Sequence, residues 1–169
     1  MVKKTPHRKR VREAAKQVGH FILDTAIVAV PLYLLFSVTT ILHQIAAHLS
    51  RLFLFFLGKT ATIIINAQNG VPHLQLPGVD AEISNLCSGS LELALLVGFI
   101  AASRDKTVEQ RIKGILVGVL FFVLFNAARI AFTINSFGTP WFEPLHEALF
   151  RVVLIVGLVT YYAIWYYFE

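Results

Sequence analysis

Long apolar runs dominate this chain of 169 residues. The first covers 21–42, and it is too long for a signal-peptide core and is followed by no typical cleavage pattern, which predicts a retained membrane helix. Further runs follow at 87–102, 114–136 and 146–168. Hydrophobic residues make up 56% of the chain and charged residues only 15%, too apolar a balance for a soluble domain of this length. The sequence therefore predicts a single-domain, all-α polytopic membrane protein with about four transmembrane helices.

Basic residues indicate how these helices are oriented. Seven lysines and arginines lie in the segment 1–20, directly before the first apolar run. Nucleic-acid binding is one interpretation of such a cluster, but its position favours a cytoplasmic flank. The loop 103–113 holds four more and is also expected in the cytoplasm. Both termini are then cytoplasmic, and the helices 87–102 and 146–168 begin at the outer face, where 114–136 ends.

The segment 43–86 fits this scheme only outside the bilayer. Its first part, 43–60, is largely apolar but contains His48, Arg51 and Lys59. A fifth span here would put the basic loop on the wrong side, so we expect an interfacial helix or an outward continuation of the first helix. The remainder has β-branched runs and an Asn-Gly turn signal, which predict a small extracytoplasmic hairpin.

Polar residues within the helices need a partner or a function, because they are costly in lipid. At 1.5 Å per residue, Arg129 lies about 24 Å along its helix from Lys113, near the outer headgroups. Snorkelling alone would explain it, and Asn126 on the same face is a candidate partner. Glu92 would pair with Arg151 or Arg129, either orienting Arg129 or simply joining helices.

Cys87 is the only cysteine, which excludes an intramolecular disulfide. It is either a small buried residue or a reactive thiol. It lies in the motif NLCSGS at the expected start of a helix, where Ser84 or Asn85 would cap the helix and free N–H groups would stabilise a thiolate. Two residues further on, Gly89 lets another chain approach the backbone closely.

His146 follows a proline in the motif WFEPLHE, in the expected first turn of the last helix. A lone histidine at a membrane interface is more often a solvated or structural residue, and three other histidines (His43, His48 and His73) are expected on the same side. Together with Cys87 and Arg129, however, it brings an imidazole to the face that carries a thiol and a guanidinium. These groups suit acyl transfer, as acid/base, nucleophile and oxyanion stabiliser.

Helix packing is predicted at Gly114 and Gly118, which form a GxxxG pair on one helix. The aromatic residues that end the chain are typical of a membrane interface. The sequence contains no glycine-rich phosphate loop and no close cluster of metal ligands, so no cofactor is expected.

The ordered set of NLCSG at Cys87, NAARI at Arg129 and His146 resembles the exosortase/archaeosortase family of membrane-embedded cysteine transpeptidases. The resemblance covers about 61–155, and many family members have about twice as many spans as expected here. It implies that Cys87 is the nucleophile, Arg129 stabilises the thiolate or oxyanion, and His146 is the acid/base. Around these residues we expect supporting roles for Asn126, Glu92, Ser88 and Gly89.

The family resemblance also implies the partners and the location. The substrates would be secreted proteins with a C-terminal sorting signal made of a short motif, a transmembrane helix and a basic tail. The enzyme would lie in a bacterial inner or archaeal cell membrane with its site on the outer face. A non-enzymatic assembly or scaffold subunit is the alternative, in which the polar residues only join helices. A proton or ion pathway is less consistent with polar residues gathered at one face.

Overall fold

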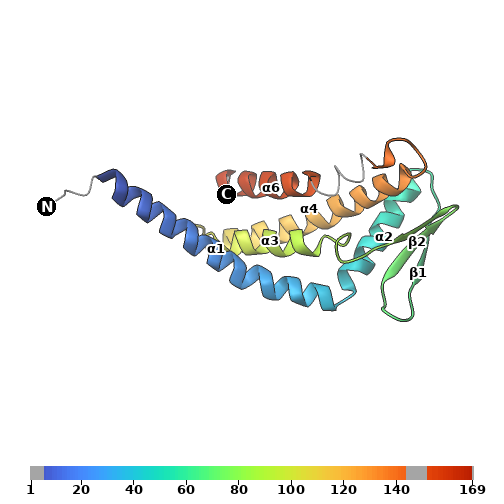
Figure 1. Ribbon diagram of the computed structural model, residues 1–169, viewed down its shortest axis with the longest axis horizontal. Helices are drawn as coiled ribbons and strands as arrows, with labels where there is room; N and C mark the ends of the chain where they lie inside the picture. The colour runs from blue at the N-terminus through green and yellow to red at the C-terminus, as the bar shows by residue number, and fades with distance from the viewer. Residues whose placement is uncertain (1–5, 144–151, 169) are drawn as a thin grey trace.

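The computed structural model describes residues 6–143 and 152–168. Their elements, in chain order, are α1 (Pro6–Val38), α2 (Ile41–Phe56), β1 (Thr62–Ile65), β2 (Pro72–Leu76), β3 (Val79–Glu82), α3 (Ser90–Ala102), α4 (Val108–Asn135) and α6 (Leu154–Phe168). The helices form an elongated bundle, and the strands lie at one end of it (Figure 1).

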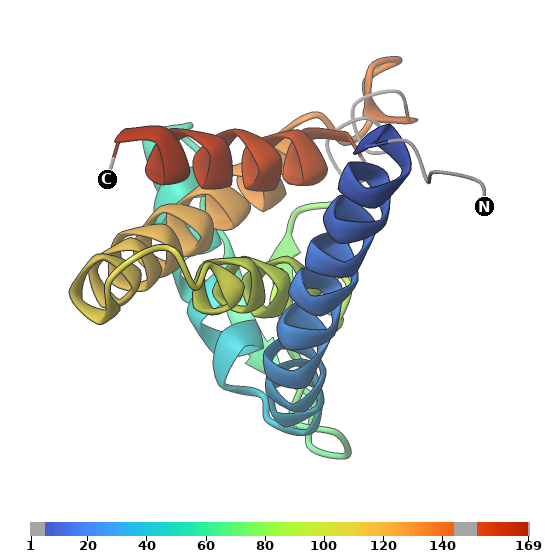
Figure 2. The same cartoon turned by 90° about the vertical axis from the view of Figure 1, so that its left-hand side faces the viewer.

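Helix α3 lies in the middle of the bundle, with α1 on one side and α4 and α6 on the other (Figure 2). Helices α3 and α6 run away from the strand-bearing end and α4 runs toward it (Figure 1). Successive helices of this part thus run in opposite directions, while the side of the membrane on which each end lies stays a prediction. Segments Arg10–Val38 and Val108–Asn135 are long and apolar enough to cross a membrane. Helices α3 and α6 have 13 and 15 residues, so their crossing stays a prediction.

Three helices differ from the sequence-based boundaries. Helix α1 covers Pro6–Val38 rather than 21–42, because the basic segment before the apolar run is helical as well. Helix α4 begins at Val108 rather than 114, because Thr107 and Gln110 form a reciprocal capping box that starts the helix inside the expected loop. Helix α3 begins at Ser90 rather than at Cys87. The loop between them is short, and Arg104 in this loop donates a 2.7 Å hydrogen bond to Asp24 of α1.

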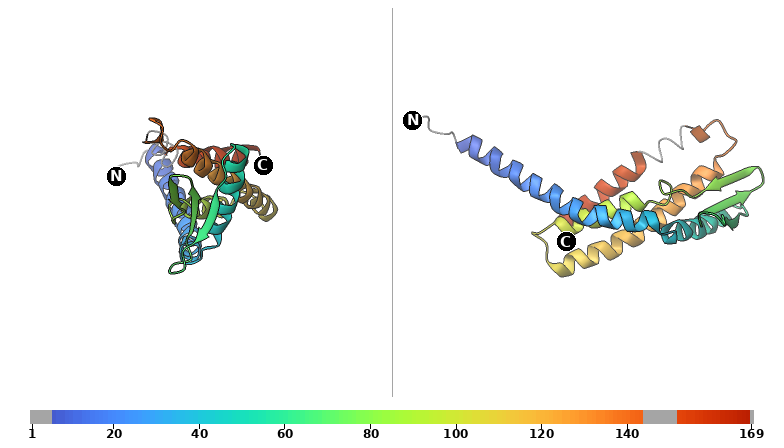
Figure 3. Two further views of the ribbon diagram at one scale, coloured as in Figure 1. Left: turned by 90° about the vertical axis from the view of Figure 1, so that its right-hand side faces the viewer. Right: turned by 60° about the horizontal axis from the view of Figure 1, so that its bottom comes forward.

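Helix α2 is separate from α1, since the two are interrupted at Thr39 and Thr40. It packs along the end of α4 (Figure 3), and the buried Ser50 hydroxyl donates to the Ala127 carbonyl at 3.1 Å. Its buried residues include the small Ala46, Ala47 and Ser50 as well as the larger His43 and Leu54. The predicted helix in 43–60 is therefore present as a helix that packs on the bundle.

The predicted hairpin is one part of a three-stranded antiparallel sheet with the order β1-β2-β3. A loop joins β1 to β2, in which Gly70 has a φ of 70° and its N–H donates to the Asn66 carbonyl. The Pro77–Gly78 turn, with a φ of 79° at Gly78, joins β2 to β3. The third strand, with the sequence VDAE, escaped prediction because four residues with two acids carry little strand signal.

Two hydrophobic clusters hold the fold together. At the strand-bearing end, residues of the sheet and α2 pack on Ile130, Ala131 and Ile134 of α4. Within the bundle, a second cluster joins α3, α4 and α6 around Phe122 and Trp165. Helix α4 therefore contributes to both clusters and fixes the sheet relative to the bundle.

The GxxxG prediction on α4 agrees with the packing. A Cβ atom at Gly114 would overlap the Trp165 indole ring, and one at Gly118 would lie 2.8 Å from side-chain atoms of Leu96 and Tyr161. The Tyr161 hydroxyl donates to the Gly114 carbonyl at 2.7 Å. Part of the aromatic cluster expected at the membrane interface therefore packs inside the bundle instead.

Candidate functional site

Cys87 lies in a turn between β3 and α3, and its side chain is half-buried. The N–H groups of Cys87 and Ser88 both donate to the Ser84 carbonyl, at 3.0 and 2.9 Å. Helix α3 starts three residues later, with Gly89 at its N-cap position and no side-chain cap among the described residues. The expectation that Ser84 or Asn85 caps a helix starting at Cys87 is therefore wrong, because the local backbone closes a turn first.

Two side chains of α4 hold this turn. Asn126 Nδ2 and Arg129 Nη2 both donate to the carbonyl oxygen of Cys87, at 2.9 and 3.1 Å. Asn126 is 3% exposed and Arg129 is 6% exposed. Snorkelling to the headgroups therefore does not explain Arg129, because its side chain is directed into the protein and contacts the cysteine residue.

Gly89 allows α4 to approach the turn closely. Its φ is 76°, and a Cβ atom at this position would lie 3.1 Å from Asn126 Nδ2. The Ser88 hydroxyl is buried and donates within the turn to the Asn85 carbonyl at 2.8 Å. Ser88 and Gly89 thus shape the turn that presents Cys87, as expected of a close helix approach.

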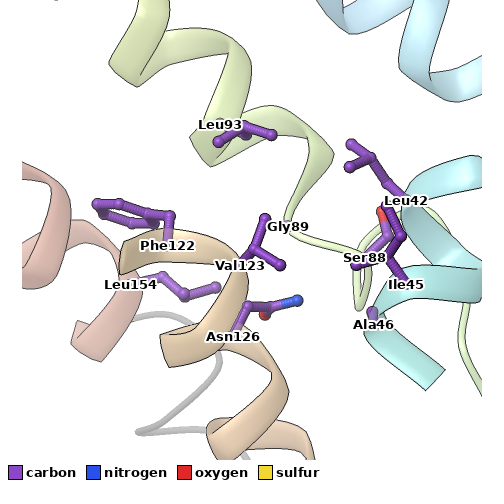
Figure 4. Close-up of a pocket in the computed structure, with 10 residues that line it drawn as sticks. All are labelled: Leu42, Ile45, Ala46, Ser88, Gly89, Leu93, Phe122, Val123, Asn126 and Leu154. Atoms are coloured by element: carbon purple, nitrogen blue, oxygen red, sulfur yellow. The ribbon is translucent and has the colours of Figure 1, made fainter. Parts of the chain in front are cut away.

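A small cavity of about 10 Å³ lies behind the turn, between α2, α3, α4 and α6. Figure 4 shows the Asn126 amide extending from α4 toward the turn that carries Ser88 and Gly89. The Asn126 Oδ1 atom is buried and has no hydrogen-bond partner among the described residues. A cavity of this size holds at most about one water molecule, so it is not a substrate site.

A larger cleft of about 220 Å³ opens on the other side of Cys87. Its lining comes from β3, the cysteine turn, the end of α4 and the residues after it: Val79, Asp80, Ala81, Glu82, Ile83, Cys87, Arg129, Ile130, Thr133, Ile134, Phe137 and Phe142. The thiol-bearing residue and the buried guanidinium therefore line one and the same cleft.

The structure does not bring Glu92 into direct contact with Arg129. Glu92 is half-buried in the first turn of α3, and within the described ranges it has no ion pair with Arg129. The other partner expected for Glu92, Arg151, lies outside the described residues.

His146 also lies outside the described residues, so its role stays a prediction. Of the rival histidines, His43 is buried on α2, and His73 Nδ1 lies 3.0 Å from the Asp80 carboxylate. Asp80 and Glu82 line the cleft but were missed, because acidic residues outside the apolar runs give no functional signal by themselves. In residues 6–143 and 152–168, no three His, Cys, Asp or Glu side chains gather as a metal site would require.

These features define a mostly helical membrane protein with a half-buried cysteine and a buried arginine in one cleft. The chain belongs to the transmembrane exosortase family, whose family model matches residues 9–163. This match confirms the family membership that was predicted from the motifs at Cys87 and Arg129.

The chain is also similar to a protein of Methanocaldococcus jannaschii named "Probable archaeosortase D". The two are 27% identical over 77 residues, which cover 46% of this chain and 50% of the relative. The chain thus aligns with about half the length of this curated relative. No solved structure matches the chain.

Proposed function

We propose that this protein is a cysteine transpeptidase or protease that removes the C-terminal sorting signal of secreted proteins. The observation that supports this best is that Cys87 and Arg129 line the same cleft. The Arg129 guanidinium also donates a hydrogen bond to the main-chain carbonyl of Cys87. A nucleophile beside a fixed, buried cation suits acyl transfer, because the cation can stabilise the charge of the oxyanion. The family membership points to the same chemistry.

In this proposal, the Cys87 thiolate attacks the scissile carbonyl carbon and forms a tetrahedral oxyanion that Arg129 stabilises. The carbon–nitrogen bond then breaks, and the leaving amine takes a proton from His146, which leaves a thioester on Cys87. An amine or water attacks the thioester and passes its proton to His146. The carbon–sulfur bond breaks, and the thiolate is restored.

The substrate is a secreted protein whose C-terminal transmembrane helix docks laterally against the bundle. We place the cleft and the sheet on the extracytoplasmic side and both termini in the cytoplasm of a cell membrane. The basic residues of the N-terminal segment and of the loop after α3 support this orientation.

The test is processing of a co-expressed substrate that carries a motif, a transmembrane helix and a basic tail. Cys87→Ala, Arg129→Ala and His146→Ala should each lower processing by about 100-fold or more. His73→Ala is the matched control, since His73 is a histidine of the same end that we do not place in the reaction. Full processing by the Cys87→Ala variant would end the proposal.

A scaffold function is the second candidate, and one observation favours it. Both hydrogen bonds that Asn126 and Arg129 make to Cys87 end on its main-chain carbonyl. A purely structural joint between α4 and the turn would look the same. In that case the alanine variants lower the amount of protein in the membrane and leave substrate processing per molecule unchanged, which quantitative blotting of both proteins distinguishes.

A further inference from the structure

Strand β3 has an open edge beside the cleft. Among the residues that the structure describes, it is the last strand of the sheet and pairs with β2 alone. Asp80 and Glu82 are exposed, whereas Val79 and Ala81 pack toward the core. One side of β3 is thus covered by β2, one face rests on the hydrophobic cluster, and the far edge is left for another chain.

The hydrogen-bond pattern shows which main-chain groups face this edge. The Ile83 N–H donates to the Pro72 carbonyl at 3.0 Å, which makes these two residues a hydrogen-bonded pair. Pairs alternate along an antiparallel ladder, so the residues two and four places before Ile83 also face β2. The N–H and C=O groups of Asp80 and Glu82 therefore point outward, and the described residues offer them no hydrogen-bond partner.

This edge runs along the wall of the cleft toward Cys87. Residues 79–83 line one side of the cleft, and Ile130 and Ile134 of α4 line the other. Val79, Ile134 and Phe137 also border a neighbouring hollow of about 270 Å³ that reaches Lys59. The two hollows share these three lining residues, and only the first reaches the cysteine turn; below, the space beside β3 that they occupy is called the groove.

We infer that an extended segment of the substrate, next to its scissile bond, binds in this groove as a fourth strand on the edge of β3. This inference rests on the proposed function and specifies how that site holds its substrate. The substrate main chain bonds to the outward N–H and C=O groups of Asp80 and Glu82, as in other cases of β-strand addition. An extended segment also exposes its carbonyl groups to attack, which the chemistry at Cys87 requires.

The geometry also sets the side-chain pattern of the bound segment. A strand beside β3 has the same two faces as the sheet. Alternate residues therefore point toward Ile130, Ile134 and Phe137 and are expected to be apolar, whereas the residues between them point outward, as Asp80 and Glu82 do. Main-chain hydrogen bonds to β3 bind the segment, and the alternation of apolar and outward-facing side chains determines which sequences fit.

The first experiment leaves the enzyme unchanged and modifies the substrate. Peptides that carry a single N-methyl group at successive positions before the scissile bond are assayed for kcat/KM with the full-length protein. Each N-methyl group that replaces a bonded N–H should lower kcat/KM about two- to tenfold, and the loss should recur at every second position. A loss that does not alternate, or no loss, would overturn strand addition.

The second experiment modifies the edge. Glu82→Pro removes an outward N–H, whereas Glu82→Ala keeps it, so the pair isolates the main-chain donor. We expect Glu82→Pro to lower kcat/KM two- to tenfold below Glu82→Ala, with equal amounts of folded protein. If Cys87→Ala abolishes processing but the two Glu82 variants are equally active, the proposed function holds and this inference fails. The inference also fails if Glu82→Pro only dissociates a dimer, since the edge then pairs with a second copy.

Discussion

Gly89→Ala tests whether the close approach of α4 to the cysteine turn matters. Gly89 has a φ of 76°, and a Cβ atom there would lie 3.1 Å from Asn126 Nδ2 and 3.2 Å from its Cγ. Gly58 is a matched control, because its φ is 74° and a Cβ atom there would meet nothing within 4 Å. The two substitutions impose the same backbone conformation on alanine, and they differ in the contact with Asn126.

The expected magnitudes follow from this difference. A left-handed conformation destabilises alanine by about 1–2 kcal/mol in either variant. Gly89→Ala also overpacks the contact with Asn126, which adds about 1–3 kcal/mol. For a chain of this length, that extra loss corresponds to a melting temperature roughly 2–12 °C below that of Gly58→Ala. The Asn126 bond to the Cys87 carbonyl must shift as well, so the turn itself is disturbed.

Melting of the purified variants in detergent, followed by circular dichroism, measures the stability difference. Processing of the tailed substrate is then compared at a temperature where both variants are folded. Gly89→Ala should process more slowly than Gly58→Ala, because the turn that carries Cys87 has moved. Equal melting temperatures together with equal processing would refute the role that we assign to this contact.

Two further predictions concern the bundle and the thiol. Gly114→Ala should lower the melting temperature, because the added methyl group meets the Trp165 ring. Gly19→Ala on α1 is the control, because a methyl group there has open space and should raise the free energy of unfolding by up to about 1 kcal/mol. Equal effects of the two substitutions on melting in detergent would contradict the packing of α4 on α6. Cys87 is the only cysteine of the chain. A membrane-impermeant maleimide added to intact cells should therefore label the wild-type protein and not the Cys87→Ala variant. If the wild-type protein is labelled only after the cells are permeabilised, the cleft faces the cytoplasm.

The helical parts were predictable because each depends on residues close in sequence. The spacing of Asn126 and Arg129 puts both on one face of a helix, and the structure directs both to Cys87. The burial of Arg129 was not predictable, since it depends on how the turn 85–89 folds over α4. The open edge of β3 escaped prediction for a similar reason, because its role depends on the pairing with β2 and the position of α4.

Helix α4 contacts both the cysteine turn, where the reaction is proposed, and the groove beside β3, where the substrate is proposed to bind. Asn126 and Arg129 hold the cysteine turn, and Ile130 and Ile134, in the next turn of the same helix, line the groove opposite β3. A rigid helix keeps these side chains at fixed separations. The distance between the bound substrate strand and the thiol is then set by α4, and not by the loops around it. Changes that tilt α4 should therefore impair substrate binding and chemistry together, even when they lie as far from the cleft as Gly114.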